Sequence, residues 1–247
     1  MGKHLNWTSE TEFDLEGVSF KCVLADYDKY RTTPEQVVLI KGKGAIDLYE
    51  TILQDAPPSN VLEFGVFEGG SPVLLSLLYD LRRYVGVELK PSVSGLTQFL
   101  DSHPVGRRIH VHFGVSQDNA DAVRAIVASE FGEEPIDLII DDASHQYGPS
   151  KRSFEIAFPL LRPGGIYVIE DWGWAHWPHF TQWGEASGLS NLIFQLTMAC
   201  AAHPQLIKEV RIFPAFAFIM KAYPPMGTGE LDLRELVGPR GKLLNLI

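Results

Sequence analysis

Short hydrophobic runs alternate with amphipathic stretches between about residue 45 and residue 169. Runs of four or five Val, Leu, Ile or Tyr residues are typical of buried parallel strands, and apolar positions spaced three or four apart are typical of helices. We expect strands at 61–64, 84–88, 109–113, 136–140 and 165–169. We expect helices at 45–53, 71–81, 121–131 and 150–161. This alternation predicts an α/β fold, with a doubly wound, Rossmann-like and mostly parallel sheet.

The two ends of the chain depart from this rhythm. Residues 1–40 are polar and aperiodic, which suggests an N-terminal arm or lid, whereas residues 41–247 are expected to form one domain. Within that domain, residues 172–190 are rich in Trp, Phe and His, and a loop of this length is commonly functional. A helix and an antiparallel strand pair joined at Pro214 are expected to follow, at 189–203, 207–213 and 215–222.

Composition narrows the class of protein. The chain has 247 residues, 45% of them hydrophobic and 21% charged, as expected for a globular protein. Its net charge of −10 argues against a nucleic-acid partner, because phosphate binding relies on clustered Lys and Arg. Cys22 and Cys200 lack CxxC spacing, so we expect two buried free thiols. Without an apolar leader or a run near the ~18 residues of a membrane span, we expect a cytoplasmic protein with no membrane partner. We also expect a homodimer.

Two acidic pairs follow directly after hydrophobic runs. Asp141-Asp142 closes the run at 136–140, and Glu170-Asp171 closes the run at 165–169. Successive parallel strands joined by a helical crossover end on the same edge of a sheet, which would bring four carboxylates together. Unit charges ~4 Å apart repel by roughly 4 kcal/mol at an effective dielectric near 20. A cation, a shared proton or a basic partner must offset that repulsion, and we interpret the pattern as a cation site. The pattern therefore predicts a divalent metal site, and carboxylate oxygens suit Mg²⁺.

A glycine-rich loop follows the first strand and is a candidate cofactor site. Gly65 and Gly69 allow close approach of a ligand to the backbone, and Ser71 is a candidate N-cap of the next helix. The N-terminus of a helix favours an anionic ligand group. Glu88 ends the second strand, near the ~20-residue distance at which an acid binds a ribose diol.

A dinucleotide is the rival ligand of this loop. The glycine spacing is GxxxG rather than GxGxxG. The Glu63 carboxylate at the start of the loop would also place a negative charge beside a negatively charged pyrophosphate. The same carboxylate suits an ammonium, and S-adenosylmethionine carries an ammonium, a carboxylate and a ribose diol. Asp141 has two open roles: it either faces that ammonium or hydrogen-bonds the neighbouring loop.

These motifs resemble a known family over roughly residues 40–222. The segment from Glu63 to Ser71 is similar to the first motif of class I S-adenosylmethionine-dependent methyltransferases, and Glu88 to their ribose-binding acid. More narrowly, the segment 141–145 and the pair Glu170-Asp171 resemble the metal-dependent sugar O-methyltransferases of macrolide biosynthesis, the macrocin and mycinamicin enzymes. They are similar also to the cephalosporin-hydroxylase-type group and to an O-methyltransferase acting on mycobacterial methylmannosides.

The resemblance implies roles for individual residues. It implies that Asp142, Glu170 and Asp171 bind Mg²⁺ and that His145 is the general base. Ala143 stands where that family usually has Gly, so the turn that carries His145 is expected to differ slightly.

The expected activity is therefore Mg²⁺-dependent transfer of a methyl group from S-adenosylmethionine to a sugar hydroxyl of a glycoside or oligosaccharide. The Trp residues of the 172–190 loop would offer flat faces to the sugar ring. Two alternatives remain open. One is methylation of a catechol-type or other natural-product hydroxyl, and the other is a non-catalytic S-adenosylmethionine-binding protein.

Overall fold

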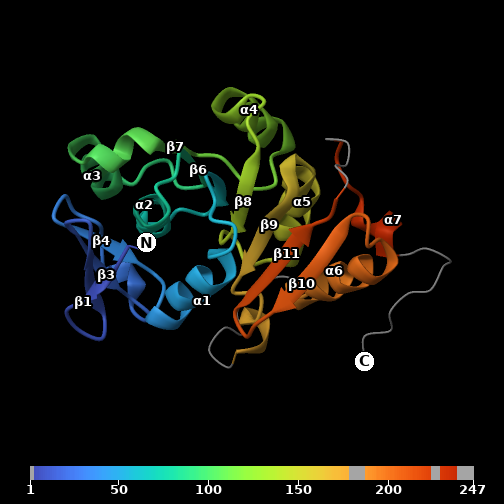
Figure 1. Ribbon diagram of the computed structural model, residues 1–247, viewed down its shortest axis with the longest axis horizontal. Helices are drawn as coiled ribbons and strands as arrows, with labels where there is room; N and C mark the ends of the chain where they lie inside the picture. The colour runs from blue at the N-terminus through green and yellow to red at the C-terminus, as the bar shows by residue number, and fades with distance from the viewer. Residues whose placement is uncertain (1–2, 178–186, 224–228, 238–247) are drawn as a thin grey trace. The chain divides into compact units, whose positions relative to one another are not determined.

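The computed structural model describes residues 3–177, 187–223 and 229–237 (Figure 1). The chain divides into two compact units. Unit 1 holds residues 1–61 and 66–114, and unit 2 holds residues 62–65 and 115–247.

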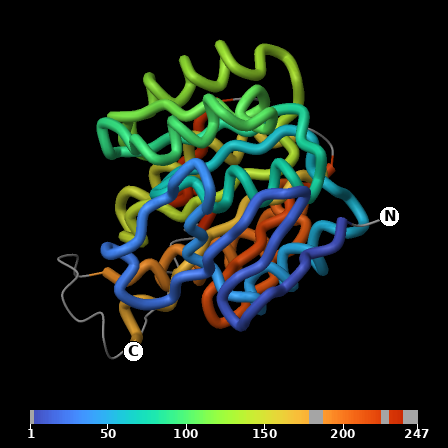
Figure 2. Tube along the Cα trace, turned by 90° about the vertical axis from the view of Figure 1, so that its left-hand side faces the viewer, coloured from blue at the N-terminus to red at the C-terminus, as the bar shows by residue number. Residues whose placement is uncertain are grey.

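Unit 1 begins with a four-stranded sheet formed by the N-terminal segment (Figure 2). The first three strands are antiparallel neighbours, and the fourth runs parallel to the third. Every second residue from Phe13 to Leu15 and from Val18 to Cys22 is buried, which is the period of a half-buried strand. The polar segment predicted to be aperiodic therefore has regular structure, and its role as an arm or lid stays a prediction. The strands are β1 (Asn6–Trp7), β2 (Glu12–Leu15), β3 (Val18–Cys22) and β4 (Gln36–Leu39).

The rest of unit 1 alternates helices with strands, and β6 pairs with β7 in parallel. One predicted detail is wrong. Ser71 is not the N-cap of its helix, because Gly69 adopts φ 85° and begins the helix two residues earlier. The α-helices and strands are α1 (Lys43–Leu53), α2 (Gly70–Leu78), β6 (Arg83–Glu88), α3 (Ser94–Ser102) and β7 (Ile109–Phe113). Short 3₁₀ turns lie at Tyr27–Lys29 and Pro104–Arg108.

Unit 2 is built on a mixed sheet in which the strand order is β10-β11-β9-β8-β5. β8 and β9 are parallel, whereas β11 is antiparallel to both β9 and β10, as predicted for the C-terminal pair. Figure 1 shows α6 beside β10 and α7 beside α6. The strands are β5 (Asn60–Phe64, in unit 2 from Leu62), β8 (Ile136–Asp141), β9 (Leu161–Glu170), β10 (Ile207–Ile212) and β11 (Phe216–Lys221). The α-helices are α4 (Ala120–Phe131), α5 (Tyr147–Ala157), α6 (Ser190–Ala202) and α7 (Leu233–Val237), with 3₁₀ turns at Phe158–Leu160 and Trp174–His176.

The hydrophobic runs of unit 2 form strands that are buried at its centre. Leu138, Ile139 and Ile140 of β8 are fully buried, as are Val168 and Ile169 of β9. Consecutive buried residues mean that both faces of these strands are covered, which is why the runs lack the alternation of a one-sided sheet. The acidic pairs lie where this burial ends, at the carboxyl ends of β8 and β9.

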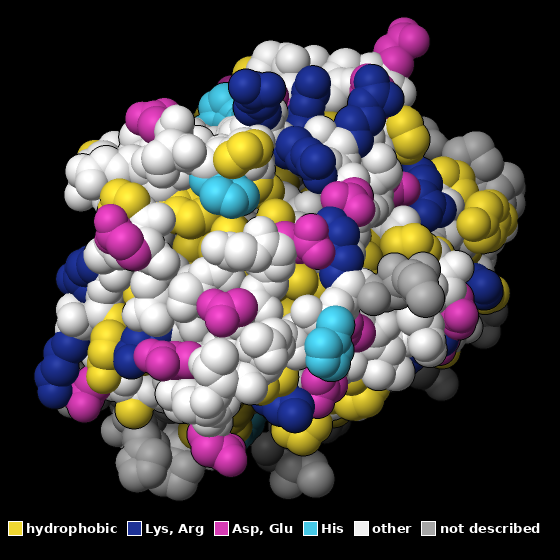
Figure 3. Space-filling view, turned by 60° about the vertical axis from the view of Figure 1, so that its left-hand side comes forward, with side chains coloured by type: hydrophobic (Ala, Val, Ile, Leu, Met, Phe, Trp, Pro, Cys, Tyr) yellow, Lys and Arg dark blue, Asp and Glu magenta, His cyan; other side chains and the backbone are white. Residues whose placement is uncertain are grey.

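The structure also bears on the predictions made from composition. Cys22 is buried as predicted, whereas Cys200 is half-buried, so the prediction of a buried thiol is wrong there. Acidic and basic side chains both occur on the face that Figure 3 shows. Among the described residues, no helix has the length and apolar character that crossing a bilayer requires.

Candidate functional site

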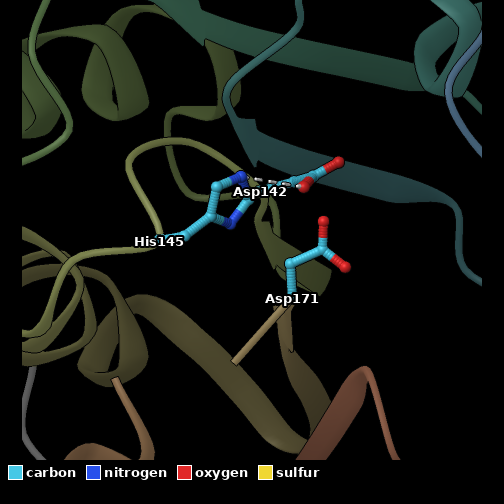
Figure 4. A group of neighbouring side chains, drawn as sticks. All are labelled: Asp142, His145 and Asp171. Carbon is cyan, nitrogen blue, oxygen red and sulfur yellow. Dashed lines mark ion pairs between the residues drawn. The ribbon is translucent and has the colours of Figure 1, made fainter. Parts of the chain in front are cut away.

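Three side chains predicted to act together meet in unit 2, at the carboxyl ends of β8 and β9. Asp142, His145 and Asp171 each present one potential ligand atom, and these atoms lie within 4.8 Å of one another. The carboxylates of Asp142 and Asp171 point toward each other, and the His145 ring faces Asp142 (Figure 4). The His145 Nε2 atom lies 3.9 Å from Asp142 Oδ1. The structure thus groups two of the four predicted carboxylates with the predicted base.

The loop that leaves β8 is held close to β5. The backbone N–H of Asp142 donates to the Phe64 carbonyl oxygen at 2.9 Å. A Cβ at Gly65 would lie 2.2 Å from the Asp142 carbonyl oxygen, so only glycine allows the two segments to approach this closely. His145 then adopts φ 54°, in the left-handed region that non-glycine residues rarely occupy. Such conformations persist where the surroundings enforce them, and they cluster at functional sites.

Asp171 has a comparable setting at the end of β9. It also adopts a positive φ, 53°, and its backbone N–H donates to the Ala215 carbonyl oxygen at 2.7 Å. The Asp171 carbonyl oxygen accepts from the Trp174 N–H at 3.1 Å, which starts a 3₁₀ turn. The turn places the Trp174 ring against His145, with 4.2 Å between the ring centroids. The loop at residues 172–190, called the aromatic loop below, therefore begins beside the candidate base. Its residues 178–186 lie outside the described part of the chain.

The first acid of each pair has different surroundings from the second. Glu170 is a buried residue of β9, and the candidate metal group found among the described residues does not include it. Asp141 is buried within unit 2, and burial raises the pKa of its carboxyl to about 6. Its oxygens accept hydrogen bonds from the side chains of Gln117, Ser153 and Tyr167. These contacts favour the second of the two roles left open for Asp141, and its contact with a cofactor ammonium stays a prediction.

The cofactor-loop residues of unit 1 are organised around Glu88. One oxygen of its carboxylate accepts the backbone N–H groups of Val66 at 2.9 Å and Phe67 at 2.8 Å. The other oxygen accepts from the Lys90 N–H at 2.8 Å. Gly69 supplies the turn into α2, and Ser71 is buried within that helix. Glu88 therefore determines the shape of the loop, in addition to its predicted role toward a ribose.

Glu63 and Gly65 complete the predicted set and lie in unit 2. Glu63 is fully buried on β5, and Gly65 follows the end of that strand. A buried carboxylate at a strand end is suited to a cationic ligand group, because such a charge requires compensation.

One contact of the loop was not predicted. The buried Glu68 carboxylate accepts the Thr32 N–H at 3.0 Å, and the Thr32 hydroxyl donates back to the Glu68 carbonyl oxygen at 2.6 Å. The N-terminal segment is therefore hydrogen-bonded to the candidate cofactor loop. The sequence signal for this contact was that Glu68 is an acidic residue inside a glycine-rich loop. Backbone amides alone would be enough for such a loop to bind an anion, so an acid there indicates another role.

The donor set fits a hard divalent cation. Mg²⁺ prefers oxygen ligands and commonly keeps several waters while one or two protein carboxylates bind it. Asp142 and Asp171 supply such carboxylates, and His145 is the third member of the group. No cysteine belongs to the group found in the described residues, and thiolates would be expected in a structural zinc site.

Comparison with known proteins identifies the domain. Residues 62–172 match a family model described as a methyltransferase domain. The chain contains a methyltransferase domain. The two strands that end at the acidic pairs, β8 and β9, lie within the matched residues, as does the candidate site.

The methyltransferase domain has relatives that act on sugars. It is 37% identical over 120 residues to the L-olivosyl-oleandolide 3-O-methyltransferase of Streptomyces antibioticus, covering 49% of this chain and 30% of the relative. It is 32% identical over 140 residues to the mycinamicin VI 2''-O-methyltransferase of Micromonospora griseorubida, covering 56% of this chain and 34% of the relative. The chain thus spans about a third of the length of these relatives. The predicted resemblance to sugar O-methyltransferases is confirmed.

Solved structures confirm the fold. The MycE methyltransferase of the mycinamycin pathway, in complex with Mg and SAH, has a TM-score of 0.58 at 23% identity, covering 71% of this chain and 48% of that one. An O-methyltransferase from Bacillus cereus in complex with SAH has a TM-score of 0.51 at 18% identity, covering 73% and 82%. The predicted class I methyltransferase fold is therefore correct.

Proposed function

We propose that this protein transfers a methyl group from S-adenosylmethionine to a sugar hydroxyl of a glycoside or oligosaccharide, in a reaction that depends on Mg²⁺. The proposal rests on the grouping of Asp142, Asp171 and His145 at the ends of two adjacent parallel strands. Relatives whose names describe methylation of sugar-bearing natural products support it.

The proposed metal ligands are Asp142 and Asp171, together with Glu170 as the family resemblance implies. When bound, Mg²⁺ supplies Lewis-acid polarisation of the acceptor hydroxyl and a template for its orientation. The close approach of loop and strand at Gly65 holds Asp142, and the turn after β9 holds Asp171. Backbone contacts therefore hold the main chain at both residues.

His145 is the proposed general base. Its Nε2 atom faces Asp142, and its ring packs on Trp174, so the imidazole has a defined orientation. In this mechanism His145 takes the hydroxyl proton onto a ring nitrogen, and the neighbouring carboxylates stabilise the imidazolium that forms. The deprotonated oxygen would then attack the methyl carbon in line, the bond from that carbon to the sulfonium sulfur would break, and S-adenosylhomocysteine would leave with the electron pair on sulfur. General-base catalysis contributes typically about 10²–10⁴-fold.

The proposed cofactor residues are those of the loop after β5, with Glu63, Gly65, Gly69, Ser71 and Glu88. S-adenosylmethionine supplies the activated methyl group. In unit 1 the Glu88 carboxylate would accept the ribose hydroxyls, while in unit 2 the Glu63 carboxylate would face the ammonium. Asp141 is a further candidate for the ammonium.

Replacing Glu88 tests the cofactor assignment. We expect Glu88→Ala to bind S-adenosylhomocysteine at least about tenfold more weakly, because a charge-assisted hydrogen bond of ~1.5–3 kcal/mol is lost. The two loop amides that Glu88 accepts lose their partner as well. Calorimetry measures the affinity. Glu12→Ala is the matched control, because Glu12 is an acid of unit 1 paired with Lys21 on the N-terminal sheet. Unchanged affinity in Glu88→Ala would remove this residue from the site.

The acceptor assignment has its own test. The Trp174 ring packs against His145 at a tilt of 37° at the start of the aromatic loop, so a sugar ring bound beside the base could pack on an indole face. Two neighbouring hydroxyls on that ring would bind the metal together. We therefore expect a glycoside deoxygenated next to the methylated carbon to react far more slowly than its parent.

A panel of glycosides and catechols gives the contrary outcomes. Equal rates for the deoxygenated and parent glycosides would contradict two-point binding of the sugar. Catechols that outcompete every glycoside would favour the phenolic alternative. Binding of S-adenosylhomocysteine without transfer to any acceptor would favour the non-catalytic alternative.

A further inference from the structure

Gln117 lies far in sequence from the proposed metal and base residues, in the segment between β7 and α4. Its side chain is buried, with 6% of the residue exposed. The amide oxygen accepts the backbone N–H of Ser144 at 3.0 Å. The amide nitrogen donates to both oxygens of Asp141, at 3.0 and 3.2 Å. One amide therefore joins the two residues on either side of the Asp142-Ala143 dipeptide.

The polarity of these contacts fixes the orientation of the amide. An ionised carboxylate only accepts hydrogen bonds, and a backbone N–H only donates. A flipped amide would place its oxygen against Asp141 and its nitrogen against the Ser144 N–H, opposing like groups on both sides. Ser153, which also hydrogen-bonds Asp141, lies 3.2 Å from the amide nitrogen and completes the network.

The network holds the loop at successive points. Asp141 is held by Gln117, the Asp142 N–H by the Phe64 carbonyl, and the Ser144 N–H by Gln117 again. The Ser144 hydroxyl then accepts the Gln146 N–H at 3.3 Å. His145 lies between these last two points, in its left-handed conformation.

We infer that Gln117 is a positioning residue that holds the loop carrying Asp142 and His145 in the conformation used for methyl transfer. The expected effect on methyl transfer rests on the proposed function. The expected effect on the conformation of the loop rests only on the hydrogen bonds of the Gln117 amide. Its contacts are with Asp141, Ser144 and Ser153 rather than with the three members of the candidate metal group. Outer residues that orient ligands typically change metal affinity or activity by about 10–100-fold when replaced.

The sharpest variant is Gln117→Glu, which keeps the size of the side chain. Its second oxygen can only accept, so it would face the Asp141 carboxylate with like charge. The variant Gln117→Glu/Asp141→Asn reverses the donor and the acceptor and restores the hydrogen bond between the two positions. We expect kcat to fall about 10–100-fold in Gln117→Glu, with KM for the acceptor changing less than kcat. In the double variant we expect amide hydrogen exchange at Ser144 to return toward the wild-type rate.

Two readouts do not depend on turnover. In Gln117→Glu, repulsion from the Asp141 carboxylate would move the new side chain away from the Ser144 N–H that its remaining oxygen accepts. Amide hydrogen exchange at Ser144 is therefore expected to be about two- to tenfold faster in Gln117→Glu, the factor that one hydrogen bond represents. Binding of Mn²⁺, followed by electron paramagnetic resonance as a probe for the metal site, is expected to weaken about 10–100-fold. Asn119→Ala is the matched control on the same segment, because its side chain caps α4 by accepting the Ala122 N–H at 3.2 Å. It should change neither readout.

Each outcome decides the inference. Unchanged Ser144 exchange and unchanged Mn²⁺ affinity in Gln117→Glu would overturn it, whatever the activity of the wild type. A double variant whose Ser144 amide exchanges as fast as in Gln117→Glu would overturn the donor–acceptor pairing. If Gln117→Glu fails to fold, the shorter Gln117→Asn, which cannot span both partners, is measured in the same way. A wild type that methylates no acceptor would contradict the proposed function, while the exchange and Mn²⁺ data would still judge Gln117.

Discussion

Asp142→Ala and Asp171→Ala variants are expected to lose methyl transfer by about 10³-fold or more. Metal ions contribute several kcal/mol of transition-state stabilisation, and each 1.36 kcal/mol is a factor of ten in rate. The two carboxylates belong to one group, so either loss should have nearly the full effect. EDTA should reproduce the same loss in the wild type, and added Mg²⁺ should reverse it there but not in the variants.

The structure offers a control on the same strand. Asp137 lies near the start of β8, where it accepts a hydrogen bond from Arg162 at 2.6 Å, and Asp137→Ala should respond to EDTA and Mg²⁺ as the wild type does. Glu170→Ala tests the third predicted ligand and should mimic EDTA. S-adenosylhomocysteine binding, measured by calorimetry, should survive in all of these variants. Full activity after exhaustive chelation would contradict the metal assignment.

The acidic strand ends could be predicted because they depend on local pattern. A run such as Ile136 to Ile140 is hydrophobic at nearly every position only when both faces of the strand are covered. The parallel crossover then places the ends of β8 and β9 on one edge, whatever the details of packing. His145 follows Asp142 by three residues, so its place near Asp142 could be predicted from their separation in the sequence.

The N-terminal sheet was missed although its signal is present. Phe13, Leu15, Val18 and Phe20 alternate with polar residues, and Glu16-Gly17 forms the turn between β2 and β3 with positive φ at both positions. Strands of two to five residues give too few alternations to stand out from a polar background.

Gln117 and Glu68 could not be predicted, for a different reason. Their partners lie 24 to 36 positions away, and such contacts depend on how loops from separate strands meet. A buried amide also has no distinctive residue pattern around it. The chain fixes these contacts through packing, which periodicity does not encode.

The second large effect is expected at His145, where replacement by Ala should lower kcat by roughly 10²–10⁴-fold with a small change in KM for the acceptor. The reason is that the imidazole acts only as the proton is removed. In the structure the imidazole lies between a carboxylate, 3.9 Å from Nε2, and the Trp174 ring, so a base at this place has a defined orientation.

Structural roles of this histidine have to be separated from catalysis. His145 adopts a positive φ, so His145→Ala alters the strain of the loop as well as removing the base. His145→Asn keeps a residue that tolerates this backbone conformation but cannot act as a base, so it should be as inactive as His145→Ala while retaining the Mn²⁺ affinity of the wild type. His203→Ala, which removes a histidine hydrogen-bonded to Leu236, is the control for loss of an imidazole elsewhere in unit 2. If His145→Asn keeps a near-normal kcat, the proton goes to another group and His145 only shapes the loop.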